Sequence, residues 1–197
     1  MSSSLRPGPA VAPVHEPQPL SRERTPRAQR IERFDTLVLG GGQAGLAASM
    51  HLSQHDVDHV ILSNEARTGD NWRRRWDSLR LFTPARFSSL PGMLFPATPT
   101  HLADKDEVAN YLETYAVRFD LPIRHRAHVT GLTADCSHFR VHVRDSPSVL
   151  EARHVIVATG PLSRPRIPVH AELLDPSIHQ LHSSAYRNPF VLPEGPV

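Results

Sequence analysis

Three glycines, Gly40, Gly42 and Gly45, have the spacing of a phosphate-binding turn. β-Forming residues precede them and an alanine-rich stretch follows, which is the strand–turn–helix context that a G-x-G-x-x-G pattern requires. The first glycine permits a tight turn, the second lets the backbone approach a pyrophosphate, and the third lets the helix pack on the strand. A glycine-rich turn without a ligand is the alternative. The residues predicted to bind a dinucleotide are Gly40, Gly41, Gly42, Gln43, Ala44 and Gly45.

The acidic residue that usually binds the ribose of a dinucleotide is missing from its expected position. A second short apolar strand, residues 59–62, ends at Ser63, where the fingerprint has Asp or Glu. The nearest carboxylate, Glu65, comes two residues later. Because a neutral hydrogen bond is roughly half as strong as a charge-assisted one, the sequence predicts weakened cofactor binding unless the Glu65 carboxylate reaches the ribose.

Residues 68–96 combine aromatic and basic side chains without a clear helical or strand period. Irregular stretches of this length are usually functional or disordered, and the aromatic content argues against disorder. A single-stranded nucleic acid or a flat aromatic cofactor with phosphates would suit such a surface. The sequence favours the cofactor because the glycine turn lies directly upstream. The aromatic residues concerned are Trp72, Trp76, Phe82, Phe87 and Phe95.

Three histidines spaced by four residues, His51, His55 and His59, are the strongest metal-like pattern in the chain. His51 and His55 can share one face of a helix. His59 follows an Asp-Val-Asp segment, beyond the point where the helix should end. We therefore interpret the three residues as a solvated helix end and predict no metal site.

The elements that position these residues follow from hydrophobic periodicity and from turn signals. The sequence predicts helices over residues 44–54 and 103–119, and the second has Asp104 or Asp106 near its N-terminus. Strands are predicted to end at residue 39 and to cover residues 59–62, 128–132, 139–143 and 154–158. The fold class is therefore α/β: a Rossmann-like dinucleotide-binding domain with a parallel sheet and a small antiparallel accessory layer.

Composition limits the classes of function. The chain has 197 residues, 39% hydrophobic and 21% charged, which suits a globular domain with a core. A net charge of +2 gives no reason to expect a nucleic-acid partner. The single cysteine, Cys136, excludes an internal disulfide and a cysteine-based zinc site, and it favours a cytoplasmic location. No apolar run reaches membrane-spanning length, so no contact with a membrane is expected.

The first 30 residues are rich in proline and arginine and poor in apolar residues. Such a segment buries too little surface to offset its ordering entropy. We predict that residues 1–30 form a disordered arm and that residues 31–197 form the dinucleotide-binding domain.

Taken in order, the motifs resemble the N-terminal part of the flavin-containing monooxygenases, the class B flavoproteins that use FAD and NADPH. The resemblance covers about residues 34–197. Two departures accompany Ser63: Gly-Gly-x-Trp has become Gly-Asp-Asn-Trp, and the Phe-x-Gly that opens the identifying motif is not recognisable before His182. The matching segments are Gly40–Gly45, Gly69–Trp72, Leu79–Pro84, Leu90–Gly92, Ala158–Gly160 and His182–Tyr186.

The resemblance implies a set of site residues. It adds Asn71, Trp72 and Thr83 to the FAD site, beside Ser63 and Glu65. It implies that Thr159 and Gly160 form a turn near FAD where the chain crosses towards an NADPH domain. His182 and Tyr186 are the tail of the identifying motif, with interdomain packing as the alternative role. The resemblance also implies that the NADPH domain would begin after residue 197, so the FAD domain is expected to be incomplete.

The implied reaction needs both cofactors. NADPH reduces the flavin, the flavin takes up O₂, and a C4a-hydroperoxyflavin oxygenates a small-molecule substrate, a soft nucleophile such as an amine or a sulfide. No protein residue is required as acid, base or nucleophile, and none is predicted to be catalytic. Two other readings stay open: a flavin-binding remnant or half enzyme completed by a partner chain, and an NAD-dependent dehydrogenase, which leaves residues 72–96 unexplained.

Overall fold

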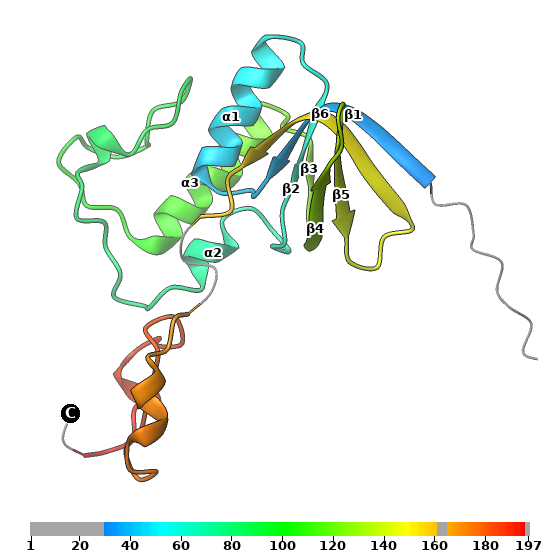
Figure 1. Cartoon of the computed structure of the whole chain (residues 1–197). Coiled ribbons are helices and arrows are strands. Elements are labelled where there is room, and N and C mark those ends of the chain that lie inside the picture. Colours follow the sequence, from blue (N-terminus) through cyan, green and yellow to red (C-terminus); the bar gives the residue numbers. More distant parts are fainter. Residues whose placement is uncertain (1–29, 161–164, 196–197) are drawn as a thin grey trace, which may run out of the picture.

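The computed structural model describes residues 30–160 and 165–195. The predicted arm lies outside these residues, except for Arg30, which begins the first strand. Six strands form one sheet in the order β3-β2-β1-β6-β5-β4. Helices α1 and α3 lie together on one side of its parallel part (Figure 1). The predicted fold class is confirmed.

The centre of the sheet is parallel. Strand β1 (Arg30–Leu39) pairs in parallel with β2 (His59–Leu62) on one side and with β6 (Ser148–Val157) on the other. The short β3 (Ile123–Arg124) extends the parallel part beyond β2. Strand β6 begins earlier than the predicted 154–158, because its first half also pairs with an antiparallel accessory strand.

The accessory strands are β4 (Val129–Ala134) and β5 (Phe139–Val143). Strand β5 pairs with the first half of β6, and β4 with β5, both antiparallel. Buried side chains of this part, such as Val141, join the cluster formed by Leu37 and Val60 of the parallel part. The accessory strands are therefore continuous with the sheet and also help to bury one of its faces.

Successive side chains of the central strands enter different cores. Leu37 and Leu39 join the cluster shared with the accessory strands, whereas Val38 joins the cluster shared with the helices. In β2, Ile61 likewise faces the helices. This is the two-residue alternation of a strand that is covered on both faces, and it explains why Thr36–Leu39 is buried without a break.

Helix α1 (Gln43–Gln54) packs on β2 partly through a polar contact. The His59 ring bonds the Ser49 hydroxyl of α1 through Nε2 (2.7 Å) and donates from Nδ1 to the Val57 carbonyl (2.7 Å). His59 is only 7% exposed. Its interpretation as part of a solvated helix end was therefore wrong: His59 is a satisfied core residue of β2, whereas His51 and His55 are exposed.

Helix α3 (Lys105–Arg118) holds the long loop of residues 74–104 through its tyrosines. The Tyr111 hydroxyl donates to the Met93 carbonyl (2.6 Å) and accepts from the Leu90 amide (2.6 Å). The Tyr115 hydroxyl donates to the Pro91 carbonyl (2.8 Å), and burial raises the pKa of both phenols. The loop predicted to be irregular contains two short helices, α2 (Asp70–Arg73) and η1 (Ala85–Phe87).

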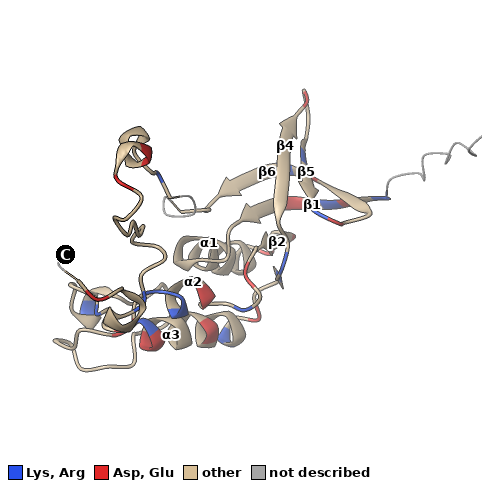
Figure 2. Ribbon diagram, turned by 90° about the horizontal axis from the view of Figure 1, so that it is seen from below, with Lys and Arg blue, Asp and Glu red and all other residues tan. Residues whose placement is uncertain are grey.

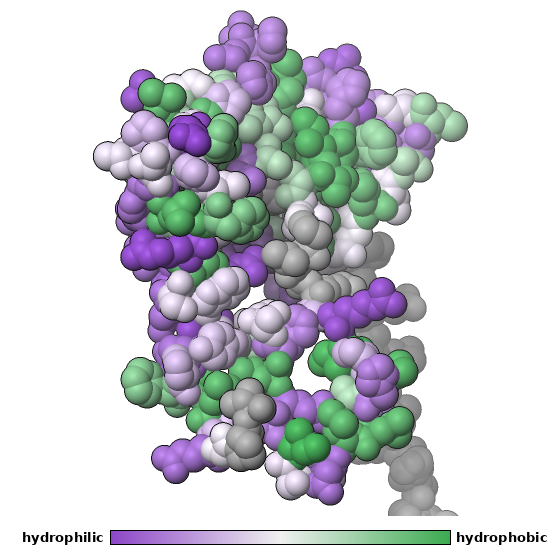
Figure 3. All heavy atoms as spheres, turned by 90° about the vertical axis from the view of Figure 1, so that its left-hand side faces the viewer, coloured by the Kyte–Doolittle hydropathy of each residue, from purple (hydrophilic) through white to green (hydrophobic). Residues whose placement is uncertain are grey.

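Residues 165–195 form a separate, mostly exposed segment below the sheet in Figure 1, with short helices η2 (Val169–Leu173) and η3 (Pro189–Val191). Two hydrogen bonds join it to the loop at Asp77: the Asp77 amide donates to the Arg187 carbonyl (2.8 Å), and the Asn188 amide group donates to the Asp77 carboxylate (2.7 Å). Apolar side chains lie uncovered on the surface of this segment, seen at the bottom of Figure 3.

The cap of α3 gives the first testable prediction. The Asp104 carboxylate accepts from the Asp106 and Glu107 amides (3.0 and 2.9 Å), and Glu107 accepts from the Asp104 amide (2.8 Å), which is a capping box. Asp104→Ala should lower the free energy of unfolding by about 1–2 kcal/mol, measured by urea denaturation. Asp104→Ser keeps a capping oxygen and should retain most of the stability; equal losses in both variants would contradict the capping role.

Candidate functional site

The predicted dinucleotide site lies where three parallel strands end at one edge of the sheet. The glycine turn follows β1, Ser63 follows β2, and Ala158 follows β6. The Gly40 amide donates to the Leu62 carbonyl (2.8 Å), and the Ala158 amide donates to the Leu39 carbonyl (2.8 Å). The structure therefore brings together three of the predicted segments: residues 40–45, residue 63 and residues 159–160.

Two glycines of the turn are required by the packing of the protein itself. Gly40 has φ +116°, and a Cβ there would lie 2.7 Å from the Ala158 carbonyl carbon. A Cβ at Gly45 would overlap the Gly40 carbonyl oxygen. The turn thus passes so close to the end of β6 and to the first turn of α1 that no side chain fits at either position.

Gly42 differs from both, because a Cβ there would meet no atom within 4 Å. Gly42 is the N-cap residue of α1, its φ of −84° is open to any residue, and no side chain caps the helix. The first turn of α1 carries no acidic residue. Open space in front of free helix N–H groups is where a phosphate binds, so these residues fit the pyrophosphate of a dinucleotide. Gln43 and Ala44 are exposed on the same turn.

Ser63 lies directly against the glycine turn. A Cβ on Gly41 would be 2.9 Å from both side-chain atoms of Ser63, which is 2% exposed. The Ser63 hydroxyl accepts from the Glu65 amide (3.3 Å). The Glu65 carboxylate forms an ion pair with Arg74, so it is already engaged and does not replace the missing acidic group in this structure.

Helix α2 carries Asn71 and Trp72, and it is fixed to α3 by charged groups. Arg67 pairs with Glu113 of α3, and Arg73 reaches the same carboxylate (2.9 Å). Figure 2 shows that acidic and basic residues both occur along α2 and α3. Trp72 packs against the helix-side core, whereas Asn71 is exposed. Sequence reasoning missed this network, because no spacing rule connects a loop arginine with a glutamate far along the chain.

Three further residues were predicted for the site: Thr83, His182 and Tyr186. Thr83 is exposed in the loop before η1. The His182 ring bonds to the Ser184 hydroxyl (2.9 Å) and amide (3.1 Å) within its own turn. Tyr186 is half-buried beside Arg187. Among the described residues, no hydrogen bond joins Thr83, His182 or Tyr186 to the glycine turn, so their place in the site stays a prediction.

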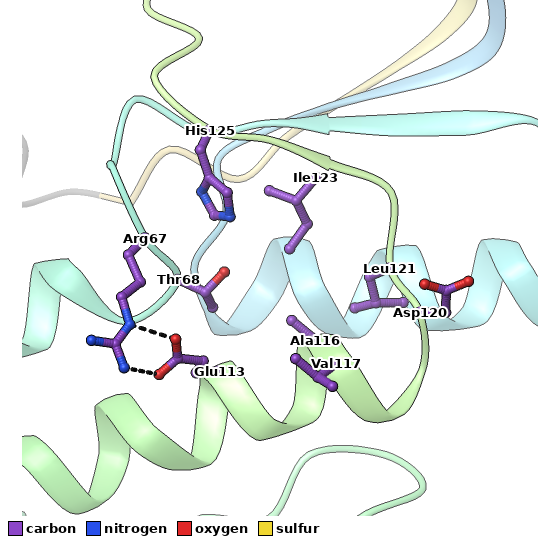
Figure 4. A pocket seen from close by; sticks show the side chains of 9 residues that line it. All are labelled: Arg67, Thr68, Glu113, Ala116, Val117, Asp120, Leu121, Ile123 and His125. Atoms are coloured by element: carbon purple, nitrogen blue, oxygen red, sulfur yellow. Dashed lines mark hydrogen bonds and ion pairs between the residues drawn. The ribbon is translucent and has the colours of Figure 1, made fainter.

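A cleft of about 330 Å³ lies between α3 and β3 (Figure 4). The Arg67–Glu113 pair stands at one end of it, and Ala116, Leu121 and Ile123 give it an apolar wall. None of the residues predicted from the sequence to bind a cofactor lines this cleft. It is therefore distinct from the glycine turn.

Comparison with known proteins identifies the family. The sequence profile of the pyridine nucleotide-disulphide oxidoreductases matches residues 37–190. A mutant of the flavin monooxygenase from Stenotrophomonas maltophilia is 35% identical, with a TM-score of 0.75 over 81% of this chain and 48% of that chain. The chain belongs to the pyridine nucleotide-disulphide oxidoreductase family, among its flavin-containing monooxygenases. The resemblance predicted from the motifs is thereby confirmed.

Curated relatives agree with this assignment. An uncharacterized CzcO-like oxidoreductase of Geobacillus kaustophilus is 46% identical over 163 residues, covering 83% of this chain and 46% of the relative. The indole-3-pyruvate monooxygenase YUCCA1 of Oryza sativa is 31% identical over 170 residues, covering 84% of this chain and 42% of the relative. The chain thus spans less than half the length of these relatives.

No helix within residues 30–160 and 165–195 is long and apolar enough to cross a membrane. No cluster of three or more His, Cys, Asp or Glu residues in that part of the chain is arranged to hold a metal ion.

The contrast between two glycines is testable by stability alone. Gly45→Ala should lower the free energy of unfolding by about 2–4 kcal/mol, because its methyl group meets backbone that cannot move away cheaply. Gly42→Ala, whose methyl group meets open space, should cost about 1 kcal/mol or less. Urea denaturation measures both, with Gly131→Ala in β4 as a glycine control. Equal losses at 42 and 45 would contradict the turn geometry.

The Glu113 network predicts a pH dependence. Its hydrogen bond with Arg67 holds the pKa of the Glu113 carboxyl below its ordinary value of 4.5. The pair therefore stabilises the fold fully above pH 4.5, and this contribution is lost as pH falls through the lower pKa of the folded state. Glu113→Gln should be less stable than the parent at pH 7 and nearly equal to it in strong acid. A stability difference that does not change with pH would contradict this role.

Proposed function

We propose that this chain is the FAD-binding part of an NADPH-dependent flavin monooxygenase. The observation that carries the proposal is the open space at Gly42, in front of an uncapped helix and between three strand ends. Neither feature is needed for the packing of the protein, and both suit a pyrophosphate. A similar solved protein supports the nicotinamide cofactor: a steroid monooxygenase bound to NADP is 26% identical, with a TM-score of 0.63.

The residues of the chain would bind and orient FAD. The N–H groups of residues 42–45 would hold the pyrophosphate, and Ser63 would face the ribose as a neutral partner. By family resemblance, Asn71, Trp72 and Thr83 would lie on the flavin side, where the indole of Trp72 offers a flat apolar surface that excludes water. Bound flavin supplies the redox and oxygen chemistry, so no side chain here has to act as acid, base or nucleophile.

The proposal extends to the hydride donor, the substrate, the partners and the location of the protein. We propose that NADPH supplies the hydride and that the substrate is a small soft nucleophile, such as an amine or a sulfide. We propose no nucleic-acid or membrane partner, and a cytoplasmic location, which a single free cysteine favours. Thr159 and Gly160, with φ +70° at Gly160, would let the chain turn away from the FAD site after β6.

A second candidate is a flavin-binding module that is inactive by itself or is completed by a partner chain. It is favoured by the uncovered apolar side chains of residues 165–195. The two candidates share the FAD site and differ in turnover. NADPH oxidation by the purified chain, followed with and without added FAD, bears on this difference: FAD-dependent oxidation would favour the monooxygenase, and retained FAD without oxidation would favour the module.

FAD binding is tested with a single substitution. The purified chain, incubated with FAD and desalted, should retain flavin absorbance near stoichiometry. Gly42→Ser should weaken FAD binding at least about tenfold, because its side chain occupies the pyrophosphate position and its hydroxyl caps the helix in place of the phosphate. The matched control, Gly131→Ser in β4, should bind FAD normally. A parent chain with a folded circular-dichroism signal and no retained flavin would overturn the proposal.

A further inference from the structure

Helix α2 follows the carboxyl end of β2, and it is too short to hold its place by itself. Residues 63–69 lead directly from β2 into α2 (Figure 1), and ligands of open α/β sheets bind beyond these strand ends. Yet α2 has only four residues, and none of them is buried. A single helical turn is not stable alone in water. The position of α2 therefore depends on its contacts with neighbouring elements.

The guanidinium group of Arg73 joins α2 to α3 and to the loop before α2. Its Nη2 donates to the Glu113 carboxylate (2.9 Å) and to the Asn110 side-chain oxygen (3.1 Å), both on α3. Its Nη1 donates to the Thr68 carbonyl (2.8 Å) and to the Asp70 carboxylate (3.2 Å). The Arg73 side chain is only 20% exposed. These bonds therefore hold a planar group in one orientation, partly shielded from water.

The backbone of α2 also meets the backbone of α3. Gly69, the N-cap residue of α2, has φ +89°, and a Cβ there would lie 2.6 Å from the Ala109 carbonyl oxygen of α3. No side chain fits between the two helices at this point. The close contact at Gly69 thus fixes one end of α2, and Arg73 fixes the other.

The docking of α2 sets the place of Trp72. The Trp72 side chain packs against the helix-side core, which Ala158 also joins at the end of β6. Ala158 in turn lies against the glycine turn, since a Cβ on Gly40 would be 2.7 Å from its carbonyl carbon. One apolar cluster therefore connects the indole with the edge of the sheet that carries the turn. A shift of α2 would move Asn71 and Trp72 relative to that edge.

We propose that Arg73 is a positioning residue of the FAD site. Through Glu113 it holds α2 on α3, and it thereby keeps Asn71 and Trp72 in place beside the flavin. The guanidinium group acts through protein contacts and does not touch FAD in this role. The inference rests on the proposed function, because it requires that FAD binds beside α2.

The two partners of the ion pair give a test that separates positioning from electrostatic attraction. FAD is anionic, so a purely electrostatic role would make Arg73→Met weaken FAD binding and Glu113→Gln strengthen it. Positioning predicts that each substitution weakens FAD binding by about tenfold. The double variant should be little worse than either single one, because the two groups act as a unit. Titration of each purified variant with FAD, followed by flavin fluorescence, measures the affinities.

Lost stability alone does not change the affinity while the chain stays folded. Each titration is therefore made without denaturant, on variants that keep the circular-dichroism signal of the parent. Arg140→Met is the matched control: it removes an arginine that donates to Glu151 (2.9 Å) in the accessory part of the sheet, and it should leave FAD binding unchanged. Gly69→Ala changes no charge and should weaken FAD binding, because its methyl group meets the backbone of α3.

The visible absorbance spectrum of bound FAD provides a second readout. It should shift in Arg73→Met and stay unchanged in Arg140→Met, since only the first substitution releases α2. If the parent binds FAD and Arg73→Met matches it in affinity and spectrum, or if Glu113→Gln binds FAD more tightly than the parent, the positioning role is wrong and the proposed function stands. If the folded parent binds no FAD, the proposed function fails, and this inference fails with it.

Discussion

The pairing of β1 with β6 is the constraint on which the rest of the structure depends. These strands lie side by side in parallel over their whole length, from Arg30 opposite Ser148 to Leu39 opposite Val157. The pairing joins the beginning of the globular part to a segment more than a hundred residues later. Because β2 pairs in parallel on the other side of β1, all three strands have their carboxyl ends on the same side of the sheet. The turns that follow these strands are therefore neighbours.

Both faces of these central strands are covered, although by different kinds of structure. The helix side is closed by α1 and α3, which contribute Leu46, Met50, Leu112 and Tyr115 to one core. The opposite side is closed by the accessory strands, through residues such as Val141. Parallel strands require burial on both faces, and the accessory strands supply the second cover from the same sheet. The glycine turn is thereby held on a rigid edge.

The sequence was sufficient for the local features of the site. The glycine spacing, the second strand and an acidic residue, Asp104 or Asp106, at the start of α3 are each encoded within a few residues, so their structure follows from local rules. The position of Ser63 after β2 was readable in the same way. These predictions depend on neighbours in the chain, and the fold does not alter them.

Contacts between distant segments could not be predicted from local sequence rules. His59 is buried against Ser49 of α1, whereas the four-residue spacing of His51, His55 and His59 suggested a solvent-facing role. The contact of Gly40 with Ala158, and the pairing of Arg67 and Arg73 with Glu113, join distant segments that no spacing rule connects. The pairing of Glu65 with Arg74, which decides whether that carboxylate is free, likewise follows from where α2 is docked.

Strand β6 has one more consequence. Its first half lies between β1 and β5, whereas its second half, residues 154–157, pairs with β1 alone within the described part of the chain. That half presents a row of open peptide groups, is rich in β-branched residues, and ends at Val157, which is 64% exposed. Unprotected edges of this kind recruit strands from other molecules. The second half of β6 is thus an open strand edge, to which a further parallel strand can be added.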